Sequence, residues 1–314
     1  MTKLMKFEAD IPGVMDSIID AQLIFPSFER IFNNLDVSLA TRLDYQSRAF
    51  EFYMYLEHTG VHLDSLLRYK QLLDADRTTK ATTKNKKLSV ARLFAKEMFR
   101  SGLLPRDISV GVKGFTQSNL HKTNGLDDAD IKKIRNWIHA DRVVTKEHYR
   151  IFSILMLLSY HGLRQVEIRR LEYADIDFVN SFAFVQGKGR DDKQKVHLHR
   201  AVLDMVRNYC QAYNVQSGSL FFSLSNNGSY GEPLSSRGLR GMVTTVLERL
   251  EIDKNVHSFR HFYTTTLVKA YRGDLFRVMH FTRHKSLSML QVYNDEIQHE
   301  AQYPVHDKIF TGVL

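Results

Sequence analysis

Two short segments near the C-terminal end of the chain concentrate residues that bind anions or move protons. In "HSFRHFY", His257 and Arg260 lie three positions apart, so both face one site if the segment is helical. In "RHKSLSMLQVYND", His284 precedes Tyr293 by nine positions. Taken alone, Tyr293 fits a half-buried core residue whose hydroxyl reaches water. Its chemistry therefore depends on which other residues surround it.

The histidines also invite comparison with metal sites. Two pairs have the four-residue spacing of helical zinc ligands: His257 with His261, and His280 with His284. A zinc protease helix needs a glutamate directly after its first histidine, and here that position holds Ser258 or Phe281. Arg260 and Arg283 would lie beside the metal and repel it. We therefore expect no metal at these histidines.

Two further segments can supply cations to an anionic substrate. In "GLRQVEIRR", Arg164 follows a glycine and Glu167 comes one helical turn later, so its carboxylate can hold the guanidinium. An ordinary intrahelical ion pair is the alternative interpretation. In "VQGKGRDD", Lys188 stands between two glycines at an expected hairpin tip, where most lysines are simply solvated.

Together these motifs resemble those of the tyrosine recombinases, also called phage-type integrases. That family shows an arginine in "GLR" with an acidic residue three positions on, a lysine in a "GKG" hairpin, an "HxxRH" helix, and a histidine nine residues before a tyrosine. The matching residues occur here in the family's order: Arg164, Glu167, Lys188, His257, Arg260, His261, His284 and Tyr293. The resemblance covers nearly all of residues 128–297 and extends more faintly to the first half.

Two features depart from the family pattern. Arg283 stands where the family usually has glycine before its histidine, which predicts a differently built turn and an added phosphate contact. The hairpin after Lys188 is slightly longer than common versions. Lys193 and Lys195 are therefore alternatives to Lys188 for the lysine that enters the site.

The resemblance implies a role for each matching residue. Tyr293 would be the nucleophile that attacks a DNA phosphate and forms a covalent ester. Arg164 and Arg260 would bind the nonbridging oxygens, and Glu167 would position Arg164. The remaining roles are implied by the family alone: Lys188 as general acid, His257 as proton-transfer residue, His284 as phosphate hydrogen-bond donor, and His261 as a supporting residue. This chemistry requires no metal or nucleotide cofactor.

The resemblance also implies a biological activity. We expect a site-specific recombinase that cleaves and rejoins double-stranded DNA at a specific site through a 3'-phosphotyrosine intermediate. A homo-tetramer would exchange strands through a Holliday junction. One alternative is a type IB topoisomerase or hairpin resolvase with the same chemistry. Another is a basic DNA-binding regulator in which Tyr293 is a core residue, although binding alone does not need these groups together.

Composition agrees with an acidic polymer as partner. The 314 residues carry a formal net charge of +9, with a pI near 9.4. The apolar run "IFSILMLL" is too short to span a bilayer, and the N-terminal residues lack a secretory signal, so we expect a cytoplasmic, DNA-associated protein without membrane contact. The single cysteine, Cys210, excludes an internal disulfide and is expected in the core.

The first half reads as successive helices. In residues 39–60, Tyr45, Ala49, Phe52 and Leu56 form one apolar face that ends at Gly60. Residues 82–105 place leucine, alanine and methionine on one face and cations on another. These cations are candidates for DNA contacts, with a solvated basic face as the alternative: Lys84, Lys86, Lys87, Arg92, Lys96 and Arg100. Arg283 is a further candidate.

The second half adds a small sheet to a helical fold. Residues 175–199 alternate around turns and predict a β-hairpin, with a third strand if "VNS" also turns. Helical patterns precede it and resume from Arg200. The fold class is therefore mainly α with a small antiparallel sheet, a helical core-binding domain plus a tyrosine-recombinase catalytic domain. The expected parts are an unassigned extension (1–30), a core-binding domain (31–112), a linker (113–126), a catalytic domain (127–297), and a tail (298–314) that packs on its own domain or on a neighbouring protomer.

Overall fold

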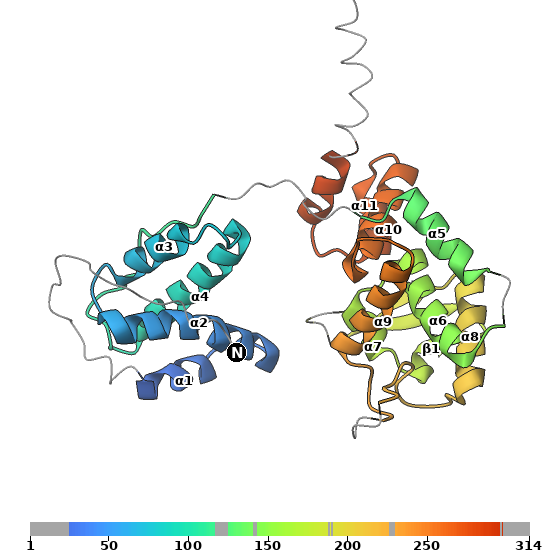
Figure 1. The fold of residues 1–314 in the computed structure, drawn as a ribbon, viewed down its shortest axis with the longest axis horizontal. Coiled ribbons are helices and arrows are strands. Elements are labelled where there is room, and N and C mark those ends of the chain that lie inside the picture. Colours follow the sequence, from blue (N-terminus) through green and yellow to red (C-terminus); the bar gives the residue numbers. More distant parts are fainter. Residues whose placement is uncertain are drawn as a thin grey trace, which may run out of the picture. The chain divides into compact units, whose positions relative to one another are not determined.

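The computed structural model describes residues 25–116, 125–140, 143–187, 189, 191–225, 230–295 and 297. The chain forms two compact units, which divide between Asn119 and Leu120 (Figure 1). Mostly helical elements with one small sheet confirm the expected fold class. Residues 1–24, Lys188 and the expected tail at 298–314 lie outside the described residues. No helix in the described ranges is both long and apolar enough to cross a membrane.

The first unit is helical throughout its described part. Its helices are α1 (Phe25–Asn33), α2 (Leu39–Thr59), α3 (Ser65–Ala75) and α4 (Ala81–Arg100). Helix α2 begins where the Ser38 hydroxyl accepts a hydrogen bond from the Thr41 amide, and it ends at Gly60, whose φ is 73°. Residues 39–60 thus form the predicted helix, with Ala49, Phe52 and Leu56 buried.

Aromatic side chains fill the core of this first unit. The rings of Phe32 and Phe94 stack with centroids 5.8 Å apart, and Phe52 packs edge-on against Phe94. Because α1 supplies Phe32, the domain boundary expected at residues 30 and 31 falls inside a helix. At the other end, the Asn85 side chain exchanges two hydrogen bonds with the backbone of Phe115. The first residues of the expected linker are therefore anchored on α4.

The second unit contains the remaining elements. In chain order they are α5 (Asp128–Ile138), α6 (Lys146–His161), α7 (Gln165–Arg170), the short 3₁₀ helix η2 (Tyr173–Asp175), β1 (Ile176–Asp177), β2 (Phe182–Gln186), β3 (Lys193–His197), α8 (Arg200–Tyr213), α9 (Ser236–Arg249), α10 (Val256–Ala270) and α11 (Leu275–Thr282). Residues 288–295 are also helical and carry Tyr293.

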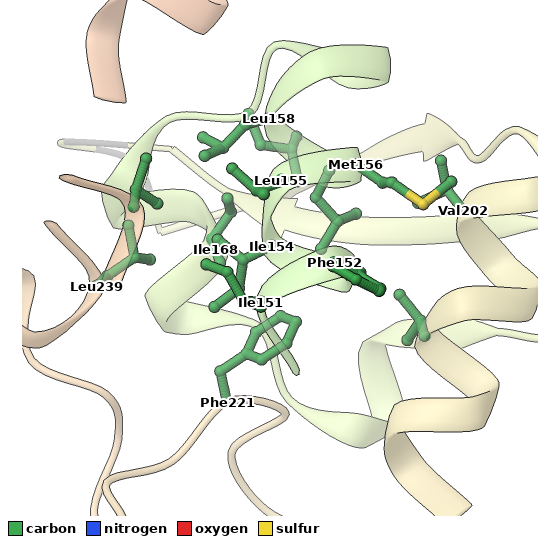
Figure 2. Close-up of a cluster of buried hydrophobic side chains, with 14 of the residues drawn as sticks. Ile151, Phe152, Ile154, Leu155, Met156, Leu158, Ile168, Val202, Phe221 and Leu239 are labelled. Atoms are coloured by element: carbon green, nitrogen blue, oxygen red, sulfur yellow. The ribbon is translucent and has the colours of Figure 1, made fainter. Parts of the chain in front are cut away.

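Helix α6 forms the centre of the second unit. Its residues from 150 to 158 are all buried, as expected of a helix that is apolar on every side. Figure 2 shows side chains of α6 meeting Ile168, Val202, Phe221 and Leu239, which come from four other parts of the unit. Helix α6 therefore fixes the positions of α7, α8 and α9 around it.

The sheet lies in the order β1-β2-β3 and is antiparallel throughout. Ala183 of β2 pairs with Ile176 on one side and Val196 on the other. The turn at "VNS" and the hairpin between β2 and β3 confirm the three-strand prediction.

A second, smaller cluster lies at the C-terminal end of the unit. Its buried members are Val268, Val278, Leu290 and Tyr293, supplied by α10, α11 and residues 288–295. Helix α11 was not predicted from the sequence. It begins after a turn in which Arg272 and Gly273 both have positive φ, and the Asp274 side chain accepts from the Arg277 amide at its start.

Gly162 ends α6 and packs directly against α10, through Tyr263 and Arg260. Its φ of 54° and ψ of 32° are left-handed, and a Cβ there would lie 2.3 Å from Cδ1 of Tyr263. Its carbonyl oxygen accepts a hydrogen bond of 2.7 Å from the guanidinium of Arg260. Glycine is therefore required both for the chain direction and for the close approach of α10.

Replacing Gly162 should destabilise the second unit severely. We expect Gly162→Ala to lose about 1–2 kcal/mol from the left-handed backbone and roughly 1–3 kcal/mol more from overlap with Tyr263. Gly218→Ala is the matched control, because Gly218 has φ of 69° but a Cβ added there would meet no atom within 4 Å. Urea unfolding followed by fluorescence of Trp137, the single tryptophan, measures both. Equal losses in the two variants would contradict the close packing.

Candidate active site

Three of the predicted side chains line one open hollow in the second unit. The hollow has a volume of about 260 Å³ and lies between the starts of α7, α9 and α10. Arg164, His257 and Arg260 line it, together with Gln165 and Ser236. Because two guanidiniums and an imidazole face the same space, it suits an anion with several oxygen atoms.

Glu167 binds Arg164 through both of its carboxylate oxygens. Its Oε1 accepts from Nη1 of Arg164 at 2.7 Å, and its Oε2 accepts from the Arg164 backbone amide at 2.8 Å. The Glu167 side chain is 1% exposed, whereas that of Arg164 is 28% exposed. Burial raises the pKa of Glu167, but the charges of Arg283 and Arg164 and the bonds from Arg164 outweigh it and keep that pKa below its ordinary value. Glu167 is therefore a buried carboxylate anion.

Arg260 is the most enclosed cation of the site. It is 3% exposed, and its guanidinium donates to the carbonyl oxygens of Gly162 and Thr282. Burial, followed by repulsion from Arg164 and Arg283, lowers its pKa to about 9. Arg260 is still charged at neutral pH, and the crowding of cations means that a bound anion would relieve repulsion.

His284 is held in one tautomer by its neighbours. The Thr282 hydroxyl donates to the Val278 carbonyl at 2.9 Å, so it must accept from Nδ1–H of His284 at 2.7 Å. This leaves Nε2 as an acceptor, which faces Nη2 of Arg260 at 3.5 Å. Burial and the charge of Arg260 lower the pKa of His284 to about 3. The ring is therefore neutral at physiological pH.

Tyr293 lies against the histidines. Its ring centroid is 5.2 Å from that of His261 and 6.5 Å from that of His284, and it is 6% exposed. His261 in turn packs edge-on against the exposed His257, at 5.0 Å. Tyr293 is also close enough to Arg260 for their charges to interact. The structure thus brings the predicted tyrosine to the edge of the cationic group.

Arg283 differs from its expected surface position. Its side chain is 6% exposed, and its Nη2 donates to Oε2 of Glu167 at 3.1 Å. The residue caps α11 with φ of 56° and ψ of 36°, a left-handed conformation that costs a non-glycine residue roughly 1–2 kcal/mol. The turn is therefore built with the backbone shape of a glycine, and the added cation points to Glu167 instead of outward to a phosphate.

The hairpin lysines fall into two groups. Lys193 pairs with the buried Asp175 at 2.6 Å, and the ammonium of Lys195 lies 3.6 Å over the ring of Phe182. Both are therefore engaged on the sheet. Lys188 lies outside the described residues, but the residue before it, Gly187, accepts a hydrogen bond from Arg170 of α7 at 3.0 Å.

The basic residues of α4, in the first unit, are unequally exposed. Lys84 was predicted to contact DNA, but it is buried and its ammonium donates to the Asp74 carbonyl. Lys87 pairs with Glu51 at 2.7 Å. The others divide by exposure: Lys86, Lys96 and Arg100 are exposed, and Arg92 is half-buried.

Three residues that contact the predicted side chains or the hairpin were missed from the sequence: Gly162 through its carbonyl, Thr282 through its carbonyl and hydroxyl, and Arg170 through its side chain. Backbone acceptors leave no residue-type signal, and only the glycine in "HGLR" pointed to a special conformation. In the described ranges, no cluster of three or more histidine, cysteine or carboxylate side chains could hold a metal.

Comparison with known proteins gives one consistent family. The model of the phage integrase family matches residues 125–300. The chain is 26% identical to the tyrosine recombinase slr0733 of Synechocystis over 242 residues, which cover 76% of this chain and 75% of that protein.

Solved structures show the same fold at low identity. The XerH site-specific recombinase, bound to a palindromic difH substrate in a post-cleavage complex, superposes with a TM-score of 0.69 and 16% identity over 90% of this chain and 84% of that one. A lambda integrase tetramer bound to a Holliday junction gives a TM-score of 0.64 and 14% identity over 87% of this chain and 76% of that one.

The buried histidines should make the second unit sensitive to acid. Burial is the main cause that lowers the pKa of both His161 and His284 to about 3. The unfolded chain binds these protons near pH 6.5, so between pH 6.5 and 3 it holds more protons than the folded chain, and the free energy of unfolding must fall as pH falls. Each histidine contributes a slope of up to about 1.4 kcal/mol per pH unit.

His161→Gln isolates one of these contributions. Glutamine keeps an acceptor for the His199 amide, which bonds to His161 Nε2, but it does not titrate. We expect the variant to lose stability more slowly than the wild type between pH 6 and 4, as measured by urea unfolding with Trp137 fluorescence. Parallel curves for the two proteins would show that His161 is not buried in its neutral form.

Proposed function

Because the chain belongs to the phage integrase family, we propose that it is a site-specific tyrosine recombinase that cleaves and rejoins DNA through Tyr293. The observation that carries the proposal is the convergence around Arg260: Arg164 and His257 share its hollow, and His284 and Tyr293 lie beside it. These groups come from separate parts of the second unit, and together they match what a phosphodiester transfer needs.

The first step is binding of the scissile phosphate in the hollow. Arg164 and Arg260 present planar guanidinium forks to its two nonbridging oxygens, whose negative charge grows in the transition state. His284 can donate a hydrogen bond there only after Nε2 takes up a proton, because Nδ1–H is already bonded to Thr282. The negative phosphate favours that proton, so substrate binding and protonation of His284 are coupled.

The chemical step is a transesterification. The Tyr293 oxygen forms a bond to phosphorus while the bond from phosphorus to the 5' oxygen breaks, which leaves a 3'-phosphotyrosine. The phenol proton passes to His257, and Lys188 gives a proton to the 5' oxygen that leaves. A free phenol has a pKa near 10, so the adjacent charge of Arg260 assists the developing phenolate. The ester conserves the bond energy, and the reverse reaction with a new 5' hydroxyl rejoins the strand.

The assembly that exchanges strands is part of the same proposal. Two duplexes must be cleaved, so four protomers on double-stranded DNA would pass through a Holliday junction. The likeness in fold to the lambda integrase tetramer supports this arrangement. A type IB topoisomerase would perform the same cleavage without changing partners, so exchange between two labelled duplexes separates the two activities.

Covalent capture of DNA tests the nucleophile. DNA with a nick beside the cleavage position should trap the wild-type protein, because the short 5' product diffuses away and cannot rejoin. We expect a slow band on a denaturing gel, and Tyr293→Phe should abolish it because the attacking oxygen is gone. Tyr230→Phe, which removes a hydroxyl from an exposed residue of the second unit outside the Tyr293 cluster, should capture DNA normally.

Capture by Tyr293→Phe would show that another residue attacks the phosphate. Once capture is established, two duplexes with different labels are mixed with the wild-type protein. Products that carry both labels identify a recombinase, and relaxed but unexchanged DNA identifies a topoisomerase.

Lys188 is tested as the general acid by changing the leaving group. Lys188→Met should slow capture at least about 100-fold, as expected for loss of a general acid. A substrate with sulfur in place of the bridging 5' oxygen should restore the rate, because a thiolate leaves without a proton. Lys195→Met, on the neighbouring strand β3, should match the wild type with both substrates. A defect in Lys188→Met that sulfur does not repair would assign Lys188 to binding instead.

A further inference from the structure

We propose that Arg283 is a positioning residue for DNA cleavage: by sharing the Glu167 carboxylate with Arg164, it locks the turn at residues 282–284 to helix α7. The inference rests on the proposed function. It concerns the position at which this chain departs from the glycine usual in the family that it resembles.

The backbone conformation at Arg283 is one that favours glycine, so the arginine side chain must be accounted for by its own contacts. A left-handed residue is most easily glycine, and Arg283 adopts φ of 56° instead. Arg272 is a second arginine in this conformation, with φ of 50°, but its side chain is exposed. The side chain of Arg283 is enclosed, so the two positions separate the backbone effect from the side-chain effect.

The contacts of Arg283 join segments that are far apart in the sequence. Its Nη2 donates to Glu167, which lies 116 residues earlier, and its Nη1 donates to the Phe281 carbonyl at 3.0 Å. Both Arg283 and Glu167 are almost fully enclosed, at 6% and 1% exposure. A pair held in this way is shielded from water and has a fixed geometry, unlike a surface ion pair.

The shared carboxylate changes what Arg164 can offer a phosphate. One oxygen of Glu167 binds the Arg164 guanidinium, and the other binds the Arg164 amide and Arg283. One negative charge therefore serves two guanidiniums, so it cannot neutralise both. The positive charge of Arg164 therefore stays available in the hollow, while its hydrogen bond to Glu167 fixes the orientation of its guanidinium.

The residues on either side of Arg283 hold the other half of the site. The Thr282 carbonyl accepts from Arg260, and His284 faces the same Arg260 nitrogen. Three consecutive residues thus determine the geometry of the site. Thr282 holds Arg260, Arg283 holds Glu167 and through it Arg164, and His284 supplies the imidazole. A shift of this turn would move both guanidiniums relative to each other, and small errors in such geometry are costly to rate.

The test compares Arg283→Gly with Arg272→Gly in single-turnover capture on nicked DNA. Glycine removes the side chain while it keeps the left-handed turn, so folding should survive in both, as checked by Trp137 fluorescence. We expect Arg283→Gly to reduce the capture rate about tenfold or more at saturating protein, with DNA affinity and its salt dependence unchanged within about twofold. Arg272→Gly should match the wild type, and Arg283→Lys, which keeps the charge, should recover part of the rate.

A double variant shows whether Arg283 acts through Glu167. Glu167→Gln removes the charge that both arginines share, so adding Arg283→Gly to it should slow capture by less than about twofold further. Independent, multiplicative losses would overturn the proposal, and so would a wild-type rate in Arg283→Gly. Weaker DNA binding with a shallower salt dependence would assign Arg283 to a phosphate contact. If the wild-type protein itself fails to capture DNA, the proposed function fails instead.

Discussion

A single buried carboxylate, Glu167, is surrounded by more positive charge than it can balance. Arg164 and Arg283 both bond to it, and Arg260 lies nearby with a lowered pKa that burial and its cationic neighbours cause. Buried cations without equal countercharge are unfavourable on their own. The fold holds Arg260 with the backbone carbonyls of Gly162 and Thr282, and an anion bound in the hollow would complete the charge balance.

The placement of the core explains how such a site is tolerated. Helix α6 anchors the second unit through a large apolar cluster, and the cations sit at its C-terminal end, where Gly162 turns the chain towards α7. Helix carbonyls that would otherwise lack partners at this end favour positive charge. The apolar packing of α6 thus offsets the unfavourable free energy of placing the guanidiniums of Arg164 and Arg260 close together.

The sequence predicts which side chains gather in the site, but it does not predict the contacts that depend on backbone conformation or on backbone carbonyls. Residue types in a fixed order predicted that one site gathers several distant side chains. The structure brings these side chains together: Arg164, Glu167, Arg260, His284 and Tyr293. The direction of Arg283 could not be predicted, since it depends on a left-handed turn and on a partner 116 residues away. Thr282 acts partly through its carbonyl, which any residue possesses. Helix α11 was missed because it is short and follows an irregular turn at Gly273, whereas the long helices α2, α4 and α6 and the hairpin followed their apolar periodicity.

Tyr293 belongs to the small cluster with Val268, Val278 and Leu290, separate from the large core around α6. Regions with few buried apolar contacts open at lower free energy than the domain as a whole. The small cluster around residues 288–295 is therefore expected to open at lower free energy than the large core around α6. In the proposed reaction, the position of the Tyr293 hydroxyl would thus depend on the packing of this small cluster, whereas the positions of Arg164 and Arg260 depend on the chain around the C-terminal end of α6.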